Sequence, residues 1–469
     1  MRYVSTRGTA PELGFIDVLL AGLATDGGLY VPAQWPSLPA REPGATYAQR
    51  AAQIIQLFVG HDLPAATVQR LCDDAYATFT HPAVVPLVQL HDEHFVQELF
   101  HGPTLAFKDV ALQLVGRMFD EVLRARGQRV TIVGATSGDT GSAAIDGVKA
   151  CANVDIVILY PFGRTSDVQR KQMTTVDSPN VRVVAVDGTF DDCQDMVKAM
   201  FNDASFRDRM GLSAVNSINW ARVMAQIVYY AVACDLLATP INVCVPSGNF
   251  GNVFAGWIAK RMGAPIDQLV VASNANDILT RFFRDNDMSA SPVVPSLSPS
   301  MDIQVSSNFE RLLFEMNGRD GGVTAEQLHR FRVAGRLSVE PDQRAEFLDG
   351  TFQAARLDDT ETLDVIARTY RETGVLLDPH SAVGVGAVAA LRASGALCGT
   401  TVTLATAHPA KFPDAVERAT GVRPPLPPHL AGLFDLPEHL TLLPNDLAVI
   451  QEFVRTAFDT ERTQLPGEG

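Results

Sequence analysis

The stretch His101–Asp109 contains the residue best suited to covalent chemistry, Lys108. Apolar residues precede this stretch and a helical pattern of apolar residues follows it, which predicts Lys108 at a turn into the start of a helix, beside Phe107. The positive end of a helix dipole and an apolar surround both disfavour an ammonium group, so the amine becomes available as a nucleophile. Schiff-base formation with a carbonyl compound requires such an amine. The alternative is a solvated surface lysine in the first turn of a helix.

A glycine-rich loop, Gly134–Gly141, lies between an expected strand at 129–133 and a helix of small residues. Its glycines allow close backbone approach, and its hydroxyl groups and the helix N-terminus suit an anion such as a carboxylate. The alternative is an ordinary strand-to-helix turn capped by a threonine or an aspartate.

A second loop, Ser247–Asn252, follows an apolar strand expected at 241–245 and opens another helix. Its two glycines and two asparagines suit a phosphate group, because backbone N–H groups point outward and no acidic side chain repels the guest. The loop lacks the lysine of a P-loop and the spacing of a dinucleotide fingerprint. A plain strand-to-helix turn is the alternative here too.

A third segment, Leu404–Phe412, stands at the end of the last expected strand, 401–405. Ligands of open α/β sheets gather at the carboxyl ends of strands, and all three loops occupy such ends. Thr406 is suited to hydrogen-bond a ring nitrogen, whereas His408 is interpreted as structural and Lys411 as a solvated lysine. A weak G-x-G-x-x-A match at 384–389 follows no strand and is interpreted as close helix packing.

Composition excludes several classes of protein. The 469 residues are 46% hydrophobic and 19% charged, as in a folded protein of two or three domains. The net charge of -15 argues against nucleic acid or an anionic membrane as the principal partner, while still allowing an anionic small substrate in a cationic pocket. No uninterrupted apolar stretch reaches membrane-spanning length. Six cysteines without metal-like spacing are expected to be small buried hydrophobes, which indicates a reducing, cytoplasmic setting.

As a set, these motifs resemble the threonine synthases, which belong to the fold-type II pyridoxal-phosphate enzymes. The matching segments follow one another in the family's order and lie at residues 3–8, 26–32, 101–109, 135–141, 216–219, 246–251 and 405–412. The extra amino-terminal part, with Asp26-Gly27-Gly28, points to the longer bacterial and fungal type. The resemblance implies a lyase that converts O-phospho-L-homoserine and water to L-threonine and phosphate, the last step of threonine biosynthesis.

Strands that alternate with helices from residue 95 onward favour parallel α/β sheets. With the resemblance, this pattern predicts an α/β fold of fold-type II, with two parallel-sheet domains and a mostly helical amino-terminal domain. The expected parts are an accessory domain at 1–93, a large cofactor-binding domain at 94–128 and 238–430, a smaller α/β domain at 129–237, and a helical tail at 431–469.

The resemblance also implies the residues of the site. Lys108 would hold pyridoxal 5'-phosphate as a Schiff base and then carry protons, while Thr406 would face the pyridine nitrogen. Many relatives have asparagine where Asp139 stands, so the contact of this residue with the cofactor's ring oxygen stays open. The cofactor phosphate would bind Gly248, Asn249, Phe250, Gly251 and Asn252, and the substrate would bind Thr136, Ser137, Gly138, Asp139 and Thr140.

The substrate's phosphate needs a cationic partner, and the best candidate is Arg222. Ser217 and Asn219 are expected at the N-terminus of a long helix at 220–237, with Arg222 one turn inside; a surface arginine is the alternative. Arg164 and the region of Lys171 are second choices. No metal is expected, and both a monomer and a homodimer are compatible with the sequence. Two other functions stay open: another fold-type II lyase such as a serine or threonine dehydratase, and a non-catalytic homologue.

Overall fold

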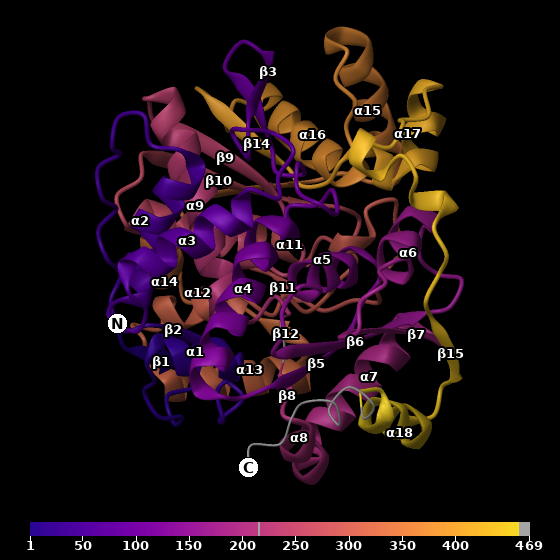
Figure 1. Cartoon of the computed structure of the whole chain (residues 1–469). Coiled ribbons are helices and arrows are strands. Elements are labelled where there is room, and N and C mark those ends of the chain that lie inside the picture. The colour runs from indigo at the N-terminus through magenta and orange to yellow at the C-terminus, as the bar shows by residue number, and fades with distance from the viewer. Residues whose placement is uncertain (214–215, 459–469) are drawn as a thin grey trace. The chain divides into compact units, whose positions relative to one another are not determined.

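The computed structural model describes residues 1–213 and 216–458 of the chain (Figure 1). The chain divides into two compact units, which are described one at a time. Unit 1 comprises residues 1–111 and 217–425, and unit 2 comprises residues 112–216 and 426–469. The four parts expected from the sequence have other bounds, and that finer division remains a prediction. Within the described residues, no helix has the length and apolar character needed to cross a membrane.

Unit 1 is built on a six-stranded sheet in the order β13-β10-β9-β14-β4-β3. Neighbouring strands are parallel except for the antiparallel pair β3–β4. Strands β9 and β14 are buried along their whole length, which requires cover on both faces of the sheet. The strands are β3 Leu87–His91, β4 His94–Glu98, β9 Ile241–Pro246, β10 Ile266–Ser273, β13 Phe352–Arg356 and β14 Thr401–Ala405.

Helices cover both faces of this sheet, as adjacent residues of β10 show. Val270 belongs to an apolar core with α15 (Asp359–Thr373), α16 (Pro379–Ala393) and α17 (Pro413–Thr420), which lie along one side of the strands (Figure 1). Leu269 points to the opposite face, as successive residues of a strand do. There it packs on Gly256 of α10 (Gly251–Arg261), which lies against α9 (Trp220–Leu237).

The amino-terminal part of unit 1 is mostly helical, as the sequence predicts. It contains β1 Tyr3–Ser5, α1 Phe15–Ala21, β2 Tyr30–Pro32, α2 Tyr47–Val59 and α3 Ala65–Tyr76. The segment between β10 and β13 adds α11 Ile278–Asp285, β11 Met288–Ser289, α12 Phe309–Met316, α13 Gly321–Ala334, β12 Arg336–Leu337 and α14 Pro341–Phe347.

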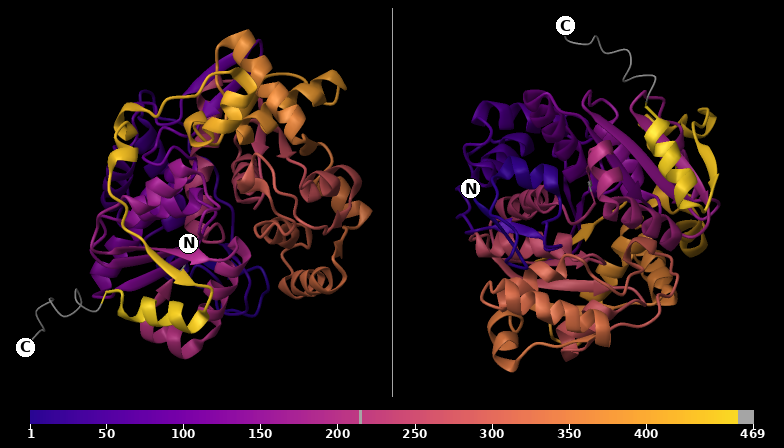
Figure 2. Two further views of the ribbon diagram at one scale, coloured as in Figure 1. Left: turned by 90° about the vertical axis from the view of Figure 1, so that its right-hand side faces the viewer. Right: turned by 90° about the horizontal axis from the view of Figure 1, so that it is seen from below.

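Unit 2 contains a five-stranded parallel sheet in the order β15-β7-β6-β5-β8. Leu159 of β6 faces a core formed with α7 and α18, whereas Ile158 faces Gly141 of α5 on the other side. The carboxyl-terminal segment lies beside these strands (yellow in Figure 2). The elements are β5 Val130–Ala135, α5 Asp139–Val148, β6 Val154–Pro161, α6 Asp167–Thr174, β7 Val181–Asp187, α7 Phe190–Asn202, α8 Ala204–Met210, β8 Leu212–Ser213, β15 Thr441–Pro444 and α18 Leu447–Thr456.

Two α/β sheets, one parallel throughout and one parallel except for the pair β3–β4, confirm the predicted fold class. The sequence pattern does not predict β3, β10, β13 or β15. One cysteine also differs from expectation: Cys398 is exposed because it lies in the turn between α16 and β14, whereas the other five cysteines are buried.

Candidate functional site

Lys108 begins α4 (Lys108–Arg126) and is only 8% exposed, so the surface-lysine alternative is wrong. Its Nζ lies 5.1 Å from the centre of the Phe107 ring. The segment before it is paired with the third loop, since Ala106 forms a bridge with Ala407 and the Phe107 N–H donates to the Thr406 carbonyl at 2.9 Å. The fold thus brings the backbones next to Lys108 and Thr406 together, as predicted.

The turn that presents Lys108 is fixed by its neighbour Asp109. The Asp109 carboxylate accepts hydrogen bonds from the Thr104 N–H at 2.8 Å and from the Thr104 hydroxyl at 2.6 Å. Lys411 is fully buried and donates to the Thr104 carbonyl at 2.8 Å, so the interpretation of Lys411 as a solvated lysine is wrong. A Cβ at Gly102 would stand 2.5 Å from the Asp109 Cβ, and only glycine fits there.

Thr406 is bonded to Ser381, which belongs to a hydrogen-bonded cluster with Asp378 and His380; the sequence pattern predicts no role for these three residues. The Thr406 N–H donates to the Ser381 hydroxyl at 3.1 Å, and this hydroxyl in turn donates to Asp378, the N-cap of α16. His380 Nδ1 lies 2.8 Å from an Asp378 oxygen, and its Nε2 accepts from the Ser300 N–H at 3.2 Å. The available signal was Asp378-Pro379, a capping residue followed by the proline favoured in a first helical turn.

The glycine turn Gly248–Asn252 leads into the N-terminus of α10. Phe250 occupies the N-cap position with φ 63°, in the left-handed region, and no side chain caps the helix. The Ser306 hydroxyl donates to the Gly248 carbonyl at 2.8 Å and the Asn308 N–H donates to the Asn249 carbonyl at 3.1 Å. These bonds hold the turn by its carbonyl groups. The first backbone N–H groups of α10 therefore stay available to donate hydrogen bonds to a ligand.

Two buried side chains at this helix N-terminus point to an anion. Asn308 Nδ2 and Asn252 Nδ2 are both buried, and neither has a hydrogen-bond partner among the described residues. A Cβ on Gly251 would stand 3.1 Å from Asn308 Nδ2, which places this donor at the start of α10. Buried donors without acceptors and an uncapped helix N-terminus suit a group with several anionic oxygens. The residues present therefore fit the phosphate of pyridoxal phosphate.

The loop of unit 2 expected to hold a carboxylate has its own internal bonds. The Thr136 hydroxyl accepts from the N–H groups of Gly138 and Gly141, each at 2.9 Å, and Asp139 accepts from Gln169 Nε2 at 2.9 Å. Thr136 and Asp139 thus shape the loop. The half-buried Ser137 and Thr140 make no side-chain hydrogen bond to a described residue, so their hydroxyls are the donors that suit a carboxylate.

The candidates for the substrate phosphate differ in their surroundings. Asn219 caps α9, since its Oδ1 accepts from the Ala221 N–H at 3.0 Å and its Nδ2 donates to the Leu19 carbonyl at 2.9 Å. Arg222 is buried, so the surface-arginine alternative is wrong, and burial lowers the pKa of its guanidinium to about 10. Lys171 donates to the carbonyls of residues 434 and 436, and Arg164 is exposed. Ser217 is half-buried. Their roles remain predictions.

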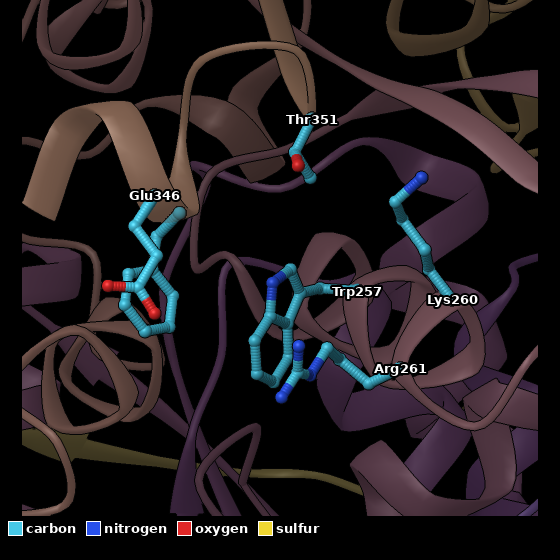
Figure 3. Close-up of a pocket in the computed structure, with 6 residues that line it drawn as sticks. Trp257, Lys260, Arg261, Glu346 and Thr351 are labelled. Atoms are coloured by element: carbon cyan, nitrogen blue, oxygen red, sulfur yellow. The ribbon is translucent and has the colours of Figure 1, made fainter.

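A small surface cavity of about 130 Å³ lies in unit 1, at the other end of α10 (Figure 3). Its walls include Trp257, Lys260 and Arg261 from the last turns of the helix, with Glu346 facing them. The cavity contains none of the predicted site residues and is not the candidate active site. The G-x-G-x-x-A match is helix packing, as predicted, since a Cβ on Gly384 would stand 2.7 Å from the Thr403 side chain.

Comparisons with known proteins decide the family. Family models match residues 2–76 ("Threonine synthase N terminus"), 80–338 ("Pyridoxal-phosphate dependent enzyme") and 381–454 ("Threonine synthase, C-terminal"). The threonine synthase of Pseudomonas aeruginosa is 53% identical, over 97% of this chain and 98% of its own length. The chain belongs to the threonine synthase family. The fission yeast threonine synthase is 41% identical over 89% of each chain.

Solved threonine synthases share the fold over the whole chain. The pyridoxal-phosphate-bound threonine synthase from Brucella melitensis has a TM-score of 0.94 and 49% identity, covering 98% of this chain and 100% of its own. The yeast threonine synthase has a TM-score of 0.91 and 38% identity, covering 99% of each chain. The predictions of threonine synthase activity, of a lyase and of pyridoxal 5'-phosphate as its cofactor are confirmed.

Proposed function

We propose that this threonine synthase converts O-phospho-L-homoserine and water to L-threonine and phosphate, with the residue roles given below. The observation that carries the proposal is the arrangement of two groups in unit 1. The backbone next to the buried Lys108 is bonded to the Thr406 segment, which follows strand β14. The neighbouring parallel strand, β9, leads into the glycine turn. Both groups stand at carboxyl ends of neighbouring parallel strands, where α/β proteins bind their ligands. The small-molecule substrate is anionic, in keeping with the hydroxyl groups of Ser137 and Thr140 at the start of α5.

When bound, pyridoxal phosphate supplies an electron sink that stabilises negative charge on substrate carbon. The chain supplies the rest. The Lys108 amine would take the proton from Cα and then one from Cβ, so that phosphate leaves Cγ; protons would then return to Cγ and Cα as water adds its hydroxyl group at Cβ. The amine must therefore be held within reach of these carbons. The bonds of Asp109 to Thr104 fix the turn and limit the motion of this amine.

The remaining roles follow from donor chemistry. Backbone N–H groups of Gly248–Asn252 and the Asn252 amide hold the cofactor phosphate, and the Thr406 hydroxyl faces the pyridine nitrogen. A neutral hydroxyl there leaves the ring nitrogen largely unprotonated and moderates its pull on electrons. Ser137 and Thr140 bind the substrate carboxylate. Ser217 and Arg222 bind the substrate phosphate, for which a guanidinium is well suited.

A product assay tests the proposal. The purified protein, supplied with O-phospho-L-homoserine, is expected to release phosphate and L-threonine in equal amounts and to form no oxoacid from threonine. The Arg222→Met variant is expected to raise KM for the phosphorylated substrate at least tenfold, with Arg222→Lys closer to the parent protein. Oxoacid release from threonine without phosphate release from the phosphorylated substrate would identify a dehydratase and overturn the proposal.

A further inference from the structure

Another buried arginine of unit 1, Arg311 of α12, is connected to the glycine turn through Asn308. Its side chain is fully buried, yet its hydrogen bonds go to neutral acceptors: Nε donates to the Tyr30 carbonyl at 3.1 Å, Nη2 donates to the Ile218 carbonyl at 2.7 Å, and Nη1 donates to Asn308 Oδ1. Its guanidinium carbon lies 5.9 Å from the centre of the Trp220 ring. Within the described residues, no carboxylate lies within ion-pair distance of this guanidinium.

The neighbouring carboxylate, Glu310, is only a partial counter-charge, because its Coulombic effect on the pKa of Arg311 is smaller than the opposing effect of burial. Glu310 binds Arg7 through two hydrogen bonds of 3.1 Å each and accepts from the Thr6 hydroxyl at 2.6 Å. Its ion pair is therefore made with Arg7 and not with Arg311. Removing a charge from water without a partner costs several kcal/mol, so buried charges in proteins are normally paired. In keeping with this cost, burial lowers the pKa of Arg311 to about 9. The fold tolerates an expensive cation at this position.

Asn308 connects this cation to the start of α10. Its Oδ1 accepts from Arg311, which fixes the amide so that Nδ2 points the other way. Nδ2 is buried, has no partner in the described part of the chain, and stands 3.1 Å from where a Cβ of Gly251 would be. A hydrogen bond accepted from a cation polarises the amide and strengthens its remaining N–H as a donor. Nδ2, the donor at the end of this series of hydrogen bonds, therefore lies at the N-terminus of α10, which no side chain caps.

We propose that Arg311 is the permanent counter-charge of the cofactor phosphate and acts on it through the Asn308 amide. Arg311 is a positioning residue, since it contacts Asn308 and not the phosphate. The role rests on the proposed placement of the phosphate at Gly248–Asn252. It explains both the buried cation without a carboxylate and the buried amide without an acceptor.

The Kd values of pyridoxal 5'-phosphate and of pyridoxal are measured with the apo protein. Because pyridoxal lacks the phosphate, the comparison distinguishes effects on phosphate binding from effects on the rest of the cofactor. Asn308→Asp is nearly isosteric and keeps the acceptor for Arg311, but it replaces the donor with an anion. We expect it to raise the Kd of pyridoxal phosphate about 100-fold and to leave the Kd of pyridoxal within threefold. Arg311→Met is expected to raise the first Kd about tenfold, and Arg311→Lys, which keeps the charge, less than Arg311→Met does.

Phosphorus NMR of the bound cofactor gives a readout that a structural role would not move. We expect the phosphate signal of Arg311→Met and Asn308→Asp to shift toward the monoanion position at neutral pH, because the stabilising charge is lost or opposed. Arg50 provides a matched control in the same unit: it is equally buried but paired with Asp235 at 2.9 Å. Arg50→Met is expected to lower stability without changing the ratio of the two Kd values.

Each outcome decides one claim. If Arg311→Met does not fold, Asn308→Asp alone carries the test, since it leaves the bonds of Arg311 in place. An unchanged ratio of the Kd values and an unchanged phosphorus signal in Asn308→Asp would overturn the proposal. Borohydride trapping of the cofactor on Lys108 in the same variants would then show that the proposed function stands. Absence of that adduct in the parent protein would overturn the proposed function itself.

Discussion

Substitutions of Phe250 measure the backbone strain in the glycine turn Gly248–Asn252. It has φ 63°, is fully buried, stacks on Phe283 at 5.7 Å and contacts Phe309 edge-on at 5.7 Å. Truncation to alanine removes this packing, at a cost of about 3–5 kcal/mol. An alanine at positive φ also keeps a strain of about 1–2 kcal/mol that glycine lacks. Glycine also makes the unfolded chain more flexible than alanine does, and this offsets about 0.4–1 kcal/mol of its advantage in the folded state. We therefore expect Phe250→Gly to be about 0.5–1 kcal/mol more stable than Phe250→Ala.

Urea unfolding of the two variants measures the difference, and Phe283 provides the control. Phe283 lies inside α11, so Phe283→Gly is expected to be about 1 kcal/mol less stable than Phe283→Ala, the opposite order. Both variants at 250 are expected to bind pyridoxal phosphate about tenfold more weakly, equivalent to about 1.4 kcal/mol, because the turn loses its anchor. If Phe250→Gly were no more stable than Phe250→Ala, the argument that the packed ring holds a strained turn would be refuted.

Three further predictions concern other parts of the chain. Gly138→Ala is expected to lower stability by about 1–3 kcal/mol and to raise KM, because Gly138 has φ 140° and a Cβ there would stand 2.6 Å from the Gln169 side chain; an unchanged unfolding midpoint would contradict this. Thr104→Val removes the hydroxyl bond to Asp109, and we expect kcat to fall about tenfold while the Kd of the cofactor stays constant; equal changes in both would argue against a role in positioning the lysine. Burial lowers the pKa of His94 from 6.5 to about 3, so the unfolded chain binds a proton that the folded chain does not. Stability is expected to fall below pH 6.5, by up to about 1.4 kcal/mol per pH unit, until about pH 3, and His94→Gln should flatten that slope in urea titrations; an identical slope would refute the assignment.

The parallel α/β pattern is readable from the sequence because its central strands are continuous apolar runs. Ile241–Pro246 is such a run, and the long apolar helix Trp220–Leu237 has the predicted bounds. Strand β10 is hidden although it is central, since Asp267 and Gln268 interrupt its start, where the pairing with β9 shifts register. Strands β3 and β13 lie at the edges of the sheet and bury their residues only in part, so their apolar signal is weak.

The features of the site also differ in how far the sequence predicts them. The lysine turn and the glycine loops can be predicted, because each is formed by consecutive residues. The environments of Lys411, Arg311 and His380 depend on partners far along the chain, such as Thr104 for Lys411 and Tyr30 for Arg311. A local pattern assigns a charged residue to solvent by default, because lysine and arginine are seldom buried. Tertiary contacts alone reveal these exceptions.

Reduction of the cofactor-loaded protein with borohydride, followed by peptide mass spectrometry, tests the central claim most directly. The account predicts one modified residue, Lys108, together with loss of the adduct and of threonine formation in Lys108→Ala. An adduct on Lys411 or on any other lysine, or full turnover by Lys108→Ala, would contradict it.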